Sequence, residues 1–287
     1  MIAAVGASPL VQDRPMTTAP EPAALLDLAV STAREAADLV ARGRASAGEQ
    51  VDVKSSPVDM VTAVDRACEE LVTSRLLGAR PEDGLLGEEG GERTGTSRVR
   101  WVVDPIDGTT NFVYGLPAYA VSIAAEVDGQ VVAGVVLNAA TGELFSATAG
   151  GGAHLTVPGA GPVRLTGSRP ASLDRALIAT GFGYRAEQRR AQAAVVAGLL
   201  PEVRDIRRHG SAALDLCTVA AGRVDAYYEM HLNRWDFAAG ALVAAEAGVV
   251  VTGLVGQPFA EPLGIAVAPS VADEFLALLT RLHRVAT

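Results

Sequence analysis

The densest group of chemically capable residues lies at positions 104–112, which read Asp-Pro-Ile-Asp-Gly-Thr-Thr-Asn-Phe. They follow a mostly apolar run at 99–103 that is typical of a buried strand. A strand that ends in an acid, turns tightly and opens a helix gathers carboxylates and free backbone N–H groups at one point. Carboxylates hold hard divalent cations, and helix N-termini hold phosphate. The segment therefore suggests metal-assisted chemistry on a phosphate ester.

The composition limits the partners that such a site could serve. The chain has 287 residues, a net charge of −9 and a pI of about 5.0. An acidic protein with no basic stripe lacks the attraction that drives nonspecific binding to nucleic acid or to anionic membranes, so we expect neither partner. Because an acidic protein repels phosphate, cations at the site would be needed to bind it.

The cysteines and histidines do not suggest a different kind of site. Cys68 and Cys217 fall in helical patterns and are typical of buried thiols in a reducing compartment. The four histidines are scattered, so a histidine-based metal site is not expected. No uncharged apolar stretch is long enough to cross a membrane. The first residues lack the features of a signal peptide, so we expect a disordered tail or start-site extension at 1–20 and a cytoplasmic location.

Periodicity in the first half predicts helices and an antiparallel sheet. Apolar residues at three- and four-residue spacing predict helices at 22–42 and 63–77. The Asp128-Gly129 pair between two apolar runs is a strong hairpin signal. The expected strands cover 99–103, 119–127, 130–137 and 143–148. A doubly wound nucleotide-binding fold is not expected here.

The second half alternates strands with helices, which predicts an α/β layer. The expected strands cover 176–180, 203–207, 225–229, 249–252 and 264–268, and the expected helices cover 186–200, 211–222, 236–247 and 270–283. Ser270 with Asp273 and Glu274 resembles a capping box at the start of the last helix. A Gly- and Pro-rich stretch at 150–170 marks a seam. We therefore expect an N-terminal α+β subdomain at 21–155 with the metal site and a C-terminal α/β subdomain at 156–287 that completes it.

Five acidic residues could contribute to this site, but each is ambiguous when taken alone. Asp65 and Asp236 lie near expected helix starts, where an acid is often only a cap. Glu88 lies in a Gly-rich loop, where acids are commonly only solvated. Asp104 and Asp107 form the most suggestive pair, and what distinguishes the five is their joint pattern.

That pattern closely resembles the inositol monophosphatase family over roughly residues 22–283. The matching segments are Lys54 with Val-Thr-Ala-Val-Asp at 61–65, Gly-Glu-Glu at 87–89, the acidic segment 104–112, Gly-Ser-Ala-Ala at 210–213, Asp-Ala-Tyr-Tyr-Glu at 225–229, Trp-Asp-Phe-Ala-Ala-Gly at 235–240 and Glu-Ala-Gly at 246–248. The nine-residue acidic segment is highly specific. The resemblance implies a mixed α/β fold, a layered αβαβα sandwich with an antiparallel sheet in the N-terminal half.

The resemblance also implies a set of metal ligands. Glu88, Asp104 and the backbone carbonyl of Ile106 would hold one Mg²⁺. Asp104 would bridge to a second Mg²⁺ held also by Asp107 and Asp236, with a weaker third metal near Glu88. Mg²⁺ prefers oxygen ligands and keeps several waters, so a few carboxylates suffice when the substrate phosphate completes the shell.

The same resemblance implies roles in catalysis and binding. Thr109, paired with Asp65, would orient the attacking water, and Glu88 would share the role of base. Backbone N–H groups of Gly108 and Thr109 would hold phosphate oxygens. The other residues expected to bind the substrate are Asp107, Gly210, Ser211, Ala212, Glu229 and Asp236. Of these, Asp107, the Ala212 backbone and Glu229 would contact the inositol hydroxyls. Lys54 lies where the family has a mobile loop over the site, and there it would offset negative charge.

The leading hypothesis is a Mg²⁺-dependent phosphomonoesterase that hydrolyses myo-inositol monophosphate, a small phosphorylated polyol. Related enzymes with the same ligands act on fructose 1,6-bisphosphate, histidinol phosphate or adenosine 3′,5′-bisphosphate, and these remain alternatives. A non-catalytic regulatory or interaction protein that keeps the fold is a third hypothesis. The resemblance further implies inhibition by Li⁺ and a homodimer.

Overall fold

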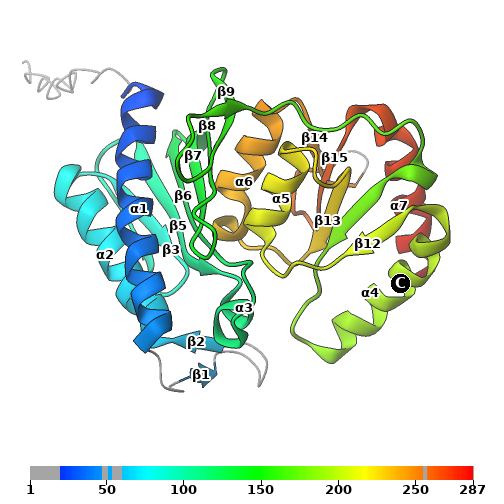
Figure 1. Ribbon diagram of the computed structural model, residues 1–287, viewed down its shortest axis with the longest axis horizontal. Helices are drawn as coiled ribbons and strands as arrows, with labels where there is room; N and C mark the ends of the chain where they lie inside the picture. The colour runs from blue at the N-terminus through cyan, green and yellow to red at the C-terminus, as the bar shows by residue number, and fades with distance from the viewer. Residues whose placement is uncertain (1–19, 47–50, 54–59, 255–256, 287) are drawn as a thin grey trace, which may run out of the picture.

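The computed structural model describes residues 20–46, 51–53, 60–254 and 257–286 of the chain. Residues 1–19 of the tail expected at 1–20 and the predicted loop lysine, Lys54, lie outside these residues. Figure 1 shows two sheets separated and flanked by helices, so that helix and sheet layers alternate across the molecule. The mixed α/β class and the αβαβα layering expected from the sequence are therefore confirmed.

The first sheet has eight strands in the order β10-β9-β8-β7-β6-β5-β3-β4. Their bounds are β3 Gly84–Gly87, β4 Gly91–Arg93, β5 Val99–Asp107, β6 Ala120–Val127, β7 Gln130–Asn138, β8 Leu144–Thr148, β9 Gly152–Thr156 and β10 Val163–Arg164. Every pair is antiparallel except β3 and β5, which are parallel, so the sheet is mixed. A separate two-stranded hairpin joins β1 Val51–Val53 to β2 Met60–Thr62.

Both faces of this sheet are covered, because side chains alternate along its central strands. Trp101 and Ile123 pack against helices α1 Pro22–Ser46 and α2 Ala63–Ala79. Val102 packs on the other face, toward helices α5 Ala212–Ala220 and α6 Arg234–Glu246. The strands β5 to β7 are thus buried on both faces, which explains why their sequences are nearly continuous apolar runs.

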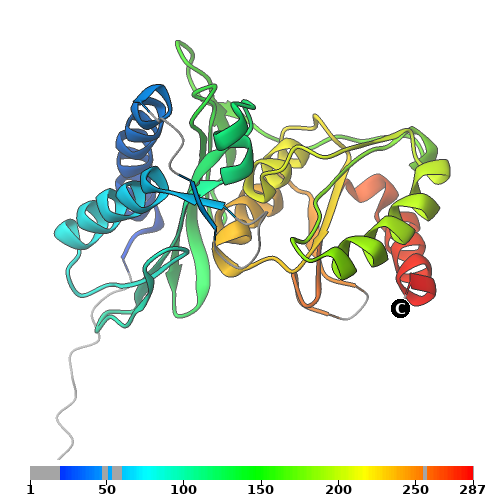
Figure 2. The same ribbon diagram turned by 90° about the horizontal axis from the view of Figure 1, so that it is seen from below.

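The second sheet has five strands in the order β12-β11-β13-β15-β14. Their bounds are β11 Leu177–Thr180, β12 Asp205–Arg207, β13 Ala226–Met230, β14 Val250–Thr252 and β15 Leu263–Val267. One face contributes to the core shared with α5 and α6, and the other packs against α4 Ala186–Leu199 and α7 Ala272–Ala286. In Figure 2 the blue and cyan helices α1 and α2 lie at one end of the molecule, and α4 and α7 lie at the other.

Helix α6 lies very close to both of its neighbours. A Cβ atom on Gly134 of β7 would lie 3.0 Å from the Cα atom of Ala239. A Cβ atom on Gly240 would lie 3.0 Å from the carbonyl oxygen of Ala213 on α5. These small residues allow the backbones of β7, α6 and α5 to approach one another, which holds the helix layer tightly between the sheets.

Most element predictions are confirmed, and the Asp128-Gly129 hairpin joins β6 to β7 with both residues at positive φ. Three expectations were wrong. The first sheet is not wholly antiparallel, and β5 does not end before the acidic segment but continues to Asp107. Ser270 caps nothing, because it lies within a 3₁₀ turn, η3 Pro269–Val271, and its hydroxyl donates to the carbonyl of Pro170.

The two-subdomain division at 155/156 stays a prediction, although β10 beyond it still pairs in the first sheet. The remaining short turns are η1 Leu173–Arg175 and η2 Leu200–Glu202, and α3 Thr109–Tyr114 follows β5 directly. Among the described residues, none of the helices has the length and apolar character needed to span a bilayer.

Candidate active site

Parallel pairing of β3 with β5 brings Glu88 beside Asp104. Gly87 and Val103 are partners in the ladder, and the N–H of Glu88 donates to the carbonyl of Val103 at 3.3 Å. The residue that follows each of these partners is therefore an acid, and burial and the charge of Glu88 both raise the pKa of Asp104. Parallel strands place equivalent ends at one sheet edge, so two acids distant in sequence become neighbours.

A β-bulge brings Asp107 into the same site. Asp104 faces Ser122 of β6 and Asp107 faces Ala120, so three steps along β5 match two along β6. In a regular strand, residues three apart point to opposite faces, and one extra residue restores the same side. The N–H of Ile106 donates to Asp104 Oδ1 at 3.0 Å across the Asp-Pro-Ile-Asp segment.

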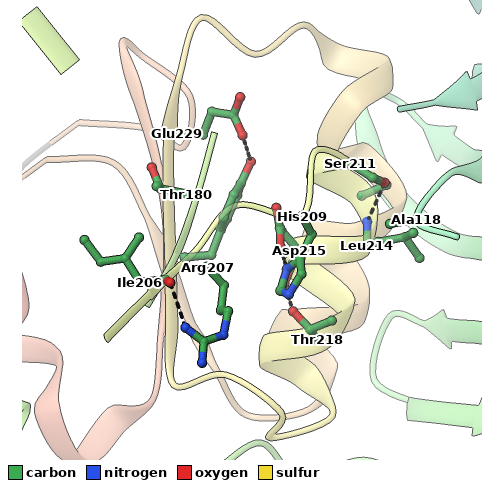
Figure 3. Close-up of polar contacts among 12 residues, drawn as sticks. Ala118, Thr180, Ile206, Arg207, His209, Ser211, Leu214, Asp215, Thr218 and Glu229 are labelled. Atoms are coloured by element: carbon green, nitrogen blue, oxygen red, sulfur yellow. Dashed lines mark hydrogen bonds and ion pairs between the residues drawn. The ribbon is translucent and has the colours of Figure 1, made fainter. Parts of the chain in front are cut away.

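The N-terminus of α5 fixes the carboxylate of Asp107. The Ser211 hydroxyl donates to Asp107 Oδ2 at 2.6 Å, and the N–H of Ala213 donates to the same oxygen at 2.7 Å. Ser211 is also the N-cap of α5 and accepts from the N–H of Leu214 at 3.3 Å (Figure 3). One serine therefore both starts the helix and joins it to the acidic segment.

Asp236 comes from the third position of α6 and accepts from the N–H of Asn233 at 2.6 Å, as in a capping box. The first residue of this helix, Arg234, forms an ion pair with Glu126 of β6, whose side chain is 1% exposed. Arg100 of β5 pairs with the other oxygen of Glu126 at 2.7 Å. This network anchors the start of α6 on the first sheet, two residues before Asp236.

The carboxyl groups interact with one another through their charges. Burial raises the pKa of Asp104 well above its ordinary value, and the nearby acids Glu88, Asp107 and Asp236 raise it further. Burial also raises the pKa of Asp107 to about 7, although the hydrogen bonds from Ser211 and Ala213 oppose the rise. The pKa of Asp236 is raised by burial first and then by Asp107. Four acids delivered by β3, β5 and α6 thus form one cluster.

Asp65 and Thr109 meet beside this cluster. Asp65 lies in the first turn of α2 and is fully buried. Thr109 Oγ1 lies 3.0 Å from Asp65 Oδ1 and 3.0 Å from the carbonyl oxygen of Ile106, so its single proton can be donated to either. Gly108 precedes Thr109 at a φ of 95°, and a Cβ atom there would lie 2.8 Å from the carbonyl oxygen of Ala118. Only glycine fits this position without strain.

Glu229 belongs to the cavity onto which the cluster opens. It is the fourth residue of β13, and burial raises its pKa to about 8 even though it accepts from the hydroxyl of Tyr227 at 2.8 Å (Figure 3). The cavity has a volume of about 550 Å³. Of the residues expected in the site, its lining includes Glu88, Asp107, Gly108, Gly210, Ala212, Glu229 and Asp236. Asp65, Asp104, Ile106, Thr109 and Ser211 are not among its lining residues.

Several residues of this region were not predicted from the sequence. Tyr227 and Glu229 are two apart on one strand, so period-two alternation could have placed Tyr227 on the same face as Glu229. The glycine-flanked residue Phe182, with Tyr184 and Arg185, also lines the cavity. His209 Nδ1 lies 2.5 Å from Asp215 Oδ1 (Figure 3), which is a contact that only the fold creates.

The donor set of the cluster suits a hard cation. It consists of carboxylate oxygens and a nearby backbone carbonyl, the ligand chemistry that Mg²⁺ prefers, and mutual repulsion leaves these acids in need of positive charge. Within the described part of the chain, no group of three or more His, Cys, Asp or Glu side chains is arranged so that it could hold a metal ion. The residues therefore fit a divalent cation in type and in electrostatics, with their final arrangement left to the bound state.

Comparisons with known proteins show which family the chain belongs to. The model of the inositol monophosphatase family matches residues 21–284, and the chain belongs to that family. It is 51% identical to "Inositol-1-monophosphatase SuhB" of Mycobacterium tuberculosis over 281 residues, which cover 92% of this chain and 96% of that protein.

Two further relatives bear on structure and on function. The solved structure "Mycobacterium tuberculosis SuhB" superposes with a TM-score of 0.79 at 49% identity, covering 91% of this chain and 98% of that one. The chain is also 42% identical to "Nus factor SuhB" of Escherichia coli strain K12 over 234 residues, which cover 81% of this chain and 86% of that protein.

The buried acids predict an unusual dependence of stability on pH. The ordinary pKa values of 3.8 for Asp107 and 4.5 for Glu229 rise to about 7 and about 8 on folding. Folding therefore takes up protons between roughly pH 4 and pH 8, so the metal-free protein should lose stability as pH rises through this window. Its thermal unfolding midpoint should fall from about pH 5 to about pH 8, and Mg²⁺ should raise the midpoint more at the higher pH.

The control is an Asp236→Asn variant, which carries one charge fewer in the cluster. It should show a smaller fall with pH and a smaller response to Mg²⁺. Equal pH dependence in the variant and the parent would contradict the assignment of the effect to these acids.

Proposed function

We propose that the protein is a Mg²⁺-dependent phosphomonoesterase that hydrolyses myo-inositol monophosphate to inositol and inorganic phosphate. The observation that carries this proposal is the meeting of Glu88, Asp104, Asp107 and Asp236 beside a cavity that also contains Glu229. Membership of a phosphatase family and the name of the Mycobacterium tuberculosis relative support the substrate class. Fructose 1,6-bisphosphate, histidinol phosphate and adenosine 3′,5′-bisphosphate remain alternative substrates.

The proposed ligands are those that the family pattern implies. Glu88, Asp104 and the Ile106 carbonyl would hold one Mg²⁺, and Asp104, Asp107 and Asp236 a second, with a weaker third near Glu88. When bound, these ions would neutralise the phosphate charge, lower the pKa of the attacking water and stabilise the departing alkoxide. Asp107 and Asp236 line the cavity, and each accepts a hydrogen bond from a backbone N–H group, which restricts how its carboxylate can turn.

The remaining residues bind and orient the reactants. The Thr109 hydroxyl lies within hydrogen-bond distance of Asp65, and together they would orient the attacking water and accept its proton, a role that Glu88 would share. Backbone N–H groups of Gly108 and Thr109 would hold phosphate oxygens. Catalysis by fixed groups of this kind depends on positioning and charge neutralisation, and it needs no covalent intermediate on the protein.

Polyol recognition would use the acids and backbone around the N-terminus of α5. Glu229 can accept two hydroxyl hydrogen bonds, and Tyr227 sets the orientation of its carboxyl group. Asp107, the Gly210-Ser211-Ala212 segment and Asp236 complete the proposed contacts. Lys54 would offset negative charge from its loop. A homodimer, inhibition by Li⁺ and a cytoplasmic location stay predictions.

A second candidate function is suggested by the name of one relative. The Escherichia coli protein is called a Nus factor, which favours an interaction role for that protein. For this chain, a scaffold role would survive loss of turnover. A pull-down that compares the parent chain with an Asp107→Asn variant would separate the two functions.

A substrate panel tests the proposed activity. Release of inorganic phosphate should be measured from inositol 1-phosphate, fructose 1,6-bisphosphate, histidinol phosphate and adenosine 3′,5′-bisphosphate while Mg²⁺ is titrated. We expect the highest kcat/KM for inositol 1-phosphate, and activity that falls in acid because protonated carboxylates lose Mg²⁺. Preference for another ester would overturn the substrate assignment, and no release from any ester would overturn the enzyme assignment.

An Asp65→Asn variant tests the water-orienting pair. Because Asn keeps the shape of the side chain but loses its charge and basicity, kcat should fall by a factor on the order of 100 or more, with a much smaller change in the Mg²⁺ concentration for half-maximal activity. Glu70→Gln, an exposed neighbour on α2, is the matched control and should behave as the parent. Turnover of the Asp65 variant at the parent rate would remove Asp65 from the mechanism.

A further inference from the structure

Helix α2 carries a second buried carboxylate one turn after Asp65. Glu69 is 4% exposed, and because residues four apart lie on one face of a helix, it lies on the same side as Asp65. Glu69 Oε2 accepts from the N–H of Glu89 at 2.9 Å, and Oε1 accepts from the N–H of Gly90 at 2.5 Å. The two carboxylate oxygens of Glu69 therefore accept hydrogen bonds from the two consecutive backbone amides that directly follow Glu88.

The chain around Glu88 is built to admit this carboxylate. A Cβ atom on Gly87 would lie 2.5 Å from Glu69 Oε1, and a Cβ atom on Gly90 would lie 2.6 Å from the same oxygen. Among the described residues, and apart from the chain neighbours of Gly90, the only other atom within 4 Å of that Cβ position is the Cδ atom of Glu69. Gly87 and Gly90 thus lie on either side of the Glu88-Glu89 pair. Because neither glycine has a side chain, the Glu69 carboxylate can occupy the space beside them.

This arrangement controls where Glu88 can lie. Residues 88–90 form the turn between β3 and β4, and the pairing of Gly87 with Gly91 closes it. The N–H of Glu88 is held by Val103, and the next two amides are held by Glu69. All three amides of the turn are therefore fixed, two of them by one charged group, and hydrogen bonds to an ionised acceptor are among the strongest in proteins.

We propose that Glu69 is a positioning residue for Glu88. It contacts neither the cavity nor the reacting atoms, and it acts by holding the turn so that the Glu88 carboxyl group stays beside Asp104. Helix α2 then supports the site at two points. Asp65 is hydrogen-bonded to Thr109, and Glu69 accepts hydrogen bonds from the turn that contains Glu88. The expected effect on Mg²⁺ affinity rests on the proposed function. The role of Glu69 in holding the turn is independent of that function.

The test uses two variants that disturb the contact from opposite sides. Glu69→Gln keeps the volume of the side chain but must turn its NH₂ group toward one of the two amides, which removes one hydrogen bond. Gly90→Ala keeps Glu69 in the sequence, but the added Cβ atom pushes the Glu69 carboxylate away from the turn. Gly90 is exposed, so this variant should fold even if the first does not. Glu70→Gln, the exposed neighbour of Glu69, is the matched control.

The first measurement is amide hydrogen exchange of the segment 84–93 in the full-length, metal-free protein. Exchange at Glu89 and Gly90 should be faster in both variants and unchanged in Glu70→Gln. The second is Mg²⁺ binding by calorimetry, for which we expect affinity to fall about 10-fold or more, as on loss of groups that orient metal ligands. The Mg²⁺ concentration for half-maximal activity should rise in parallel, with kcat at saturating Mg²⁺ changed much less.

The outcomes separate the two hypotheses. Parent-like exchange and parent-like Mg²⁺ affinity in both variants would overturn the positioning role. Independent, fully additive effects of Glu69→Gln and Gly90→Ala in the double variant would also overturn it, because one shared contact predicts that the second change adds little. Faster exchange together with a parent protein that hydrolyses no phosphate ester would instead reject the proposed function and leave the positioning of the turn intact.

Discussion

Repulsion between buried carboxylates is the constraint on which the rest of the structure depends. Like charges a few Å apart in a medium of low dielectric cannot all stay ionised without positive charge nearby, and raised pKa values are the consequence. Asp104 lies at the centre of this cluster, with Glu88, Asp107 and Asp236 around it. This repulsion therefore lowers the free energy of unfolding of the metal-free protein. Binding of cations to the folded state would raise that free energy again.

The surrounding architecture holds the acids against that repulsion. The β3–β5 register aligns Glu88 with Asp104, and the bulge in β5 turns Asp107 to the same side. Backbone N–H groups then hold Asp107 at the start of α5 and Asp236 at the start of α6, and Glu69 of α2 holds the turn after β3. Because these supports come from the first sheet and from the helix layers on both of its faces, the site depends on several layers of the fold. No single loop could provide it.

Local pattern was enough to predict most helices and strands, because periodicity reports which faces are buried. It failed where tertiary pairing overrides a local signal. The apolar run at 99–103 predicted that the strand ends at the acidic segment, yet a register shift against β6 lets β5 continue to Asp107. Ser270 had the spacing of a cap, but its hydroxyl is used on Pro170. The contacts of Glu69 and Glu126 join segments distant in sequence, and only the folded chain reveals them.

The most direct test of the carboxylate cluster is anomalous diffraction from crystals of the protein soaked in Mn²⁺, a stand-in for Mg²⁺ with the same preference for oxygen ligands. The proposed ligand sets predict strong peaks within the cluster, one contacted by Glu88 and Asp104 and one by Asp104, Asp107 and Asp236. An ordered crystal that takes up Mn²⁺ elsewhere on the protein and shows no peak among these four acids would contradict the account.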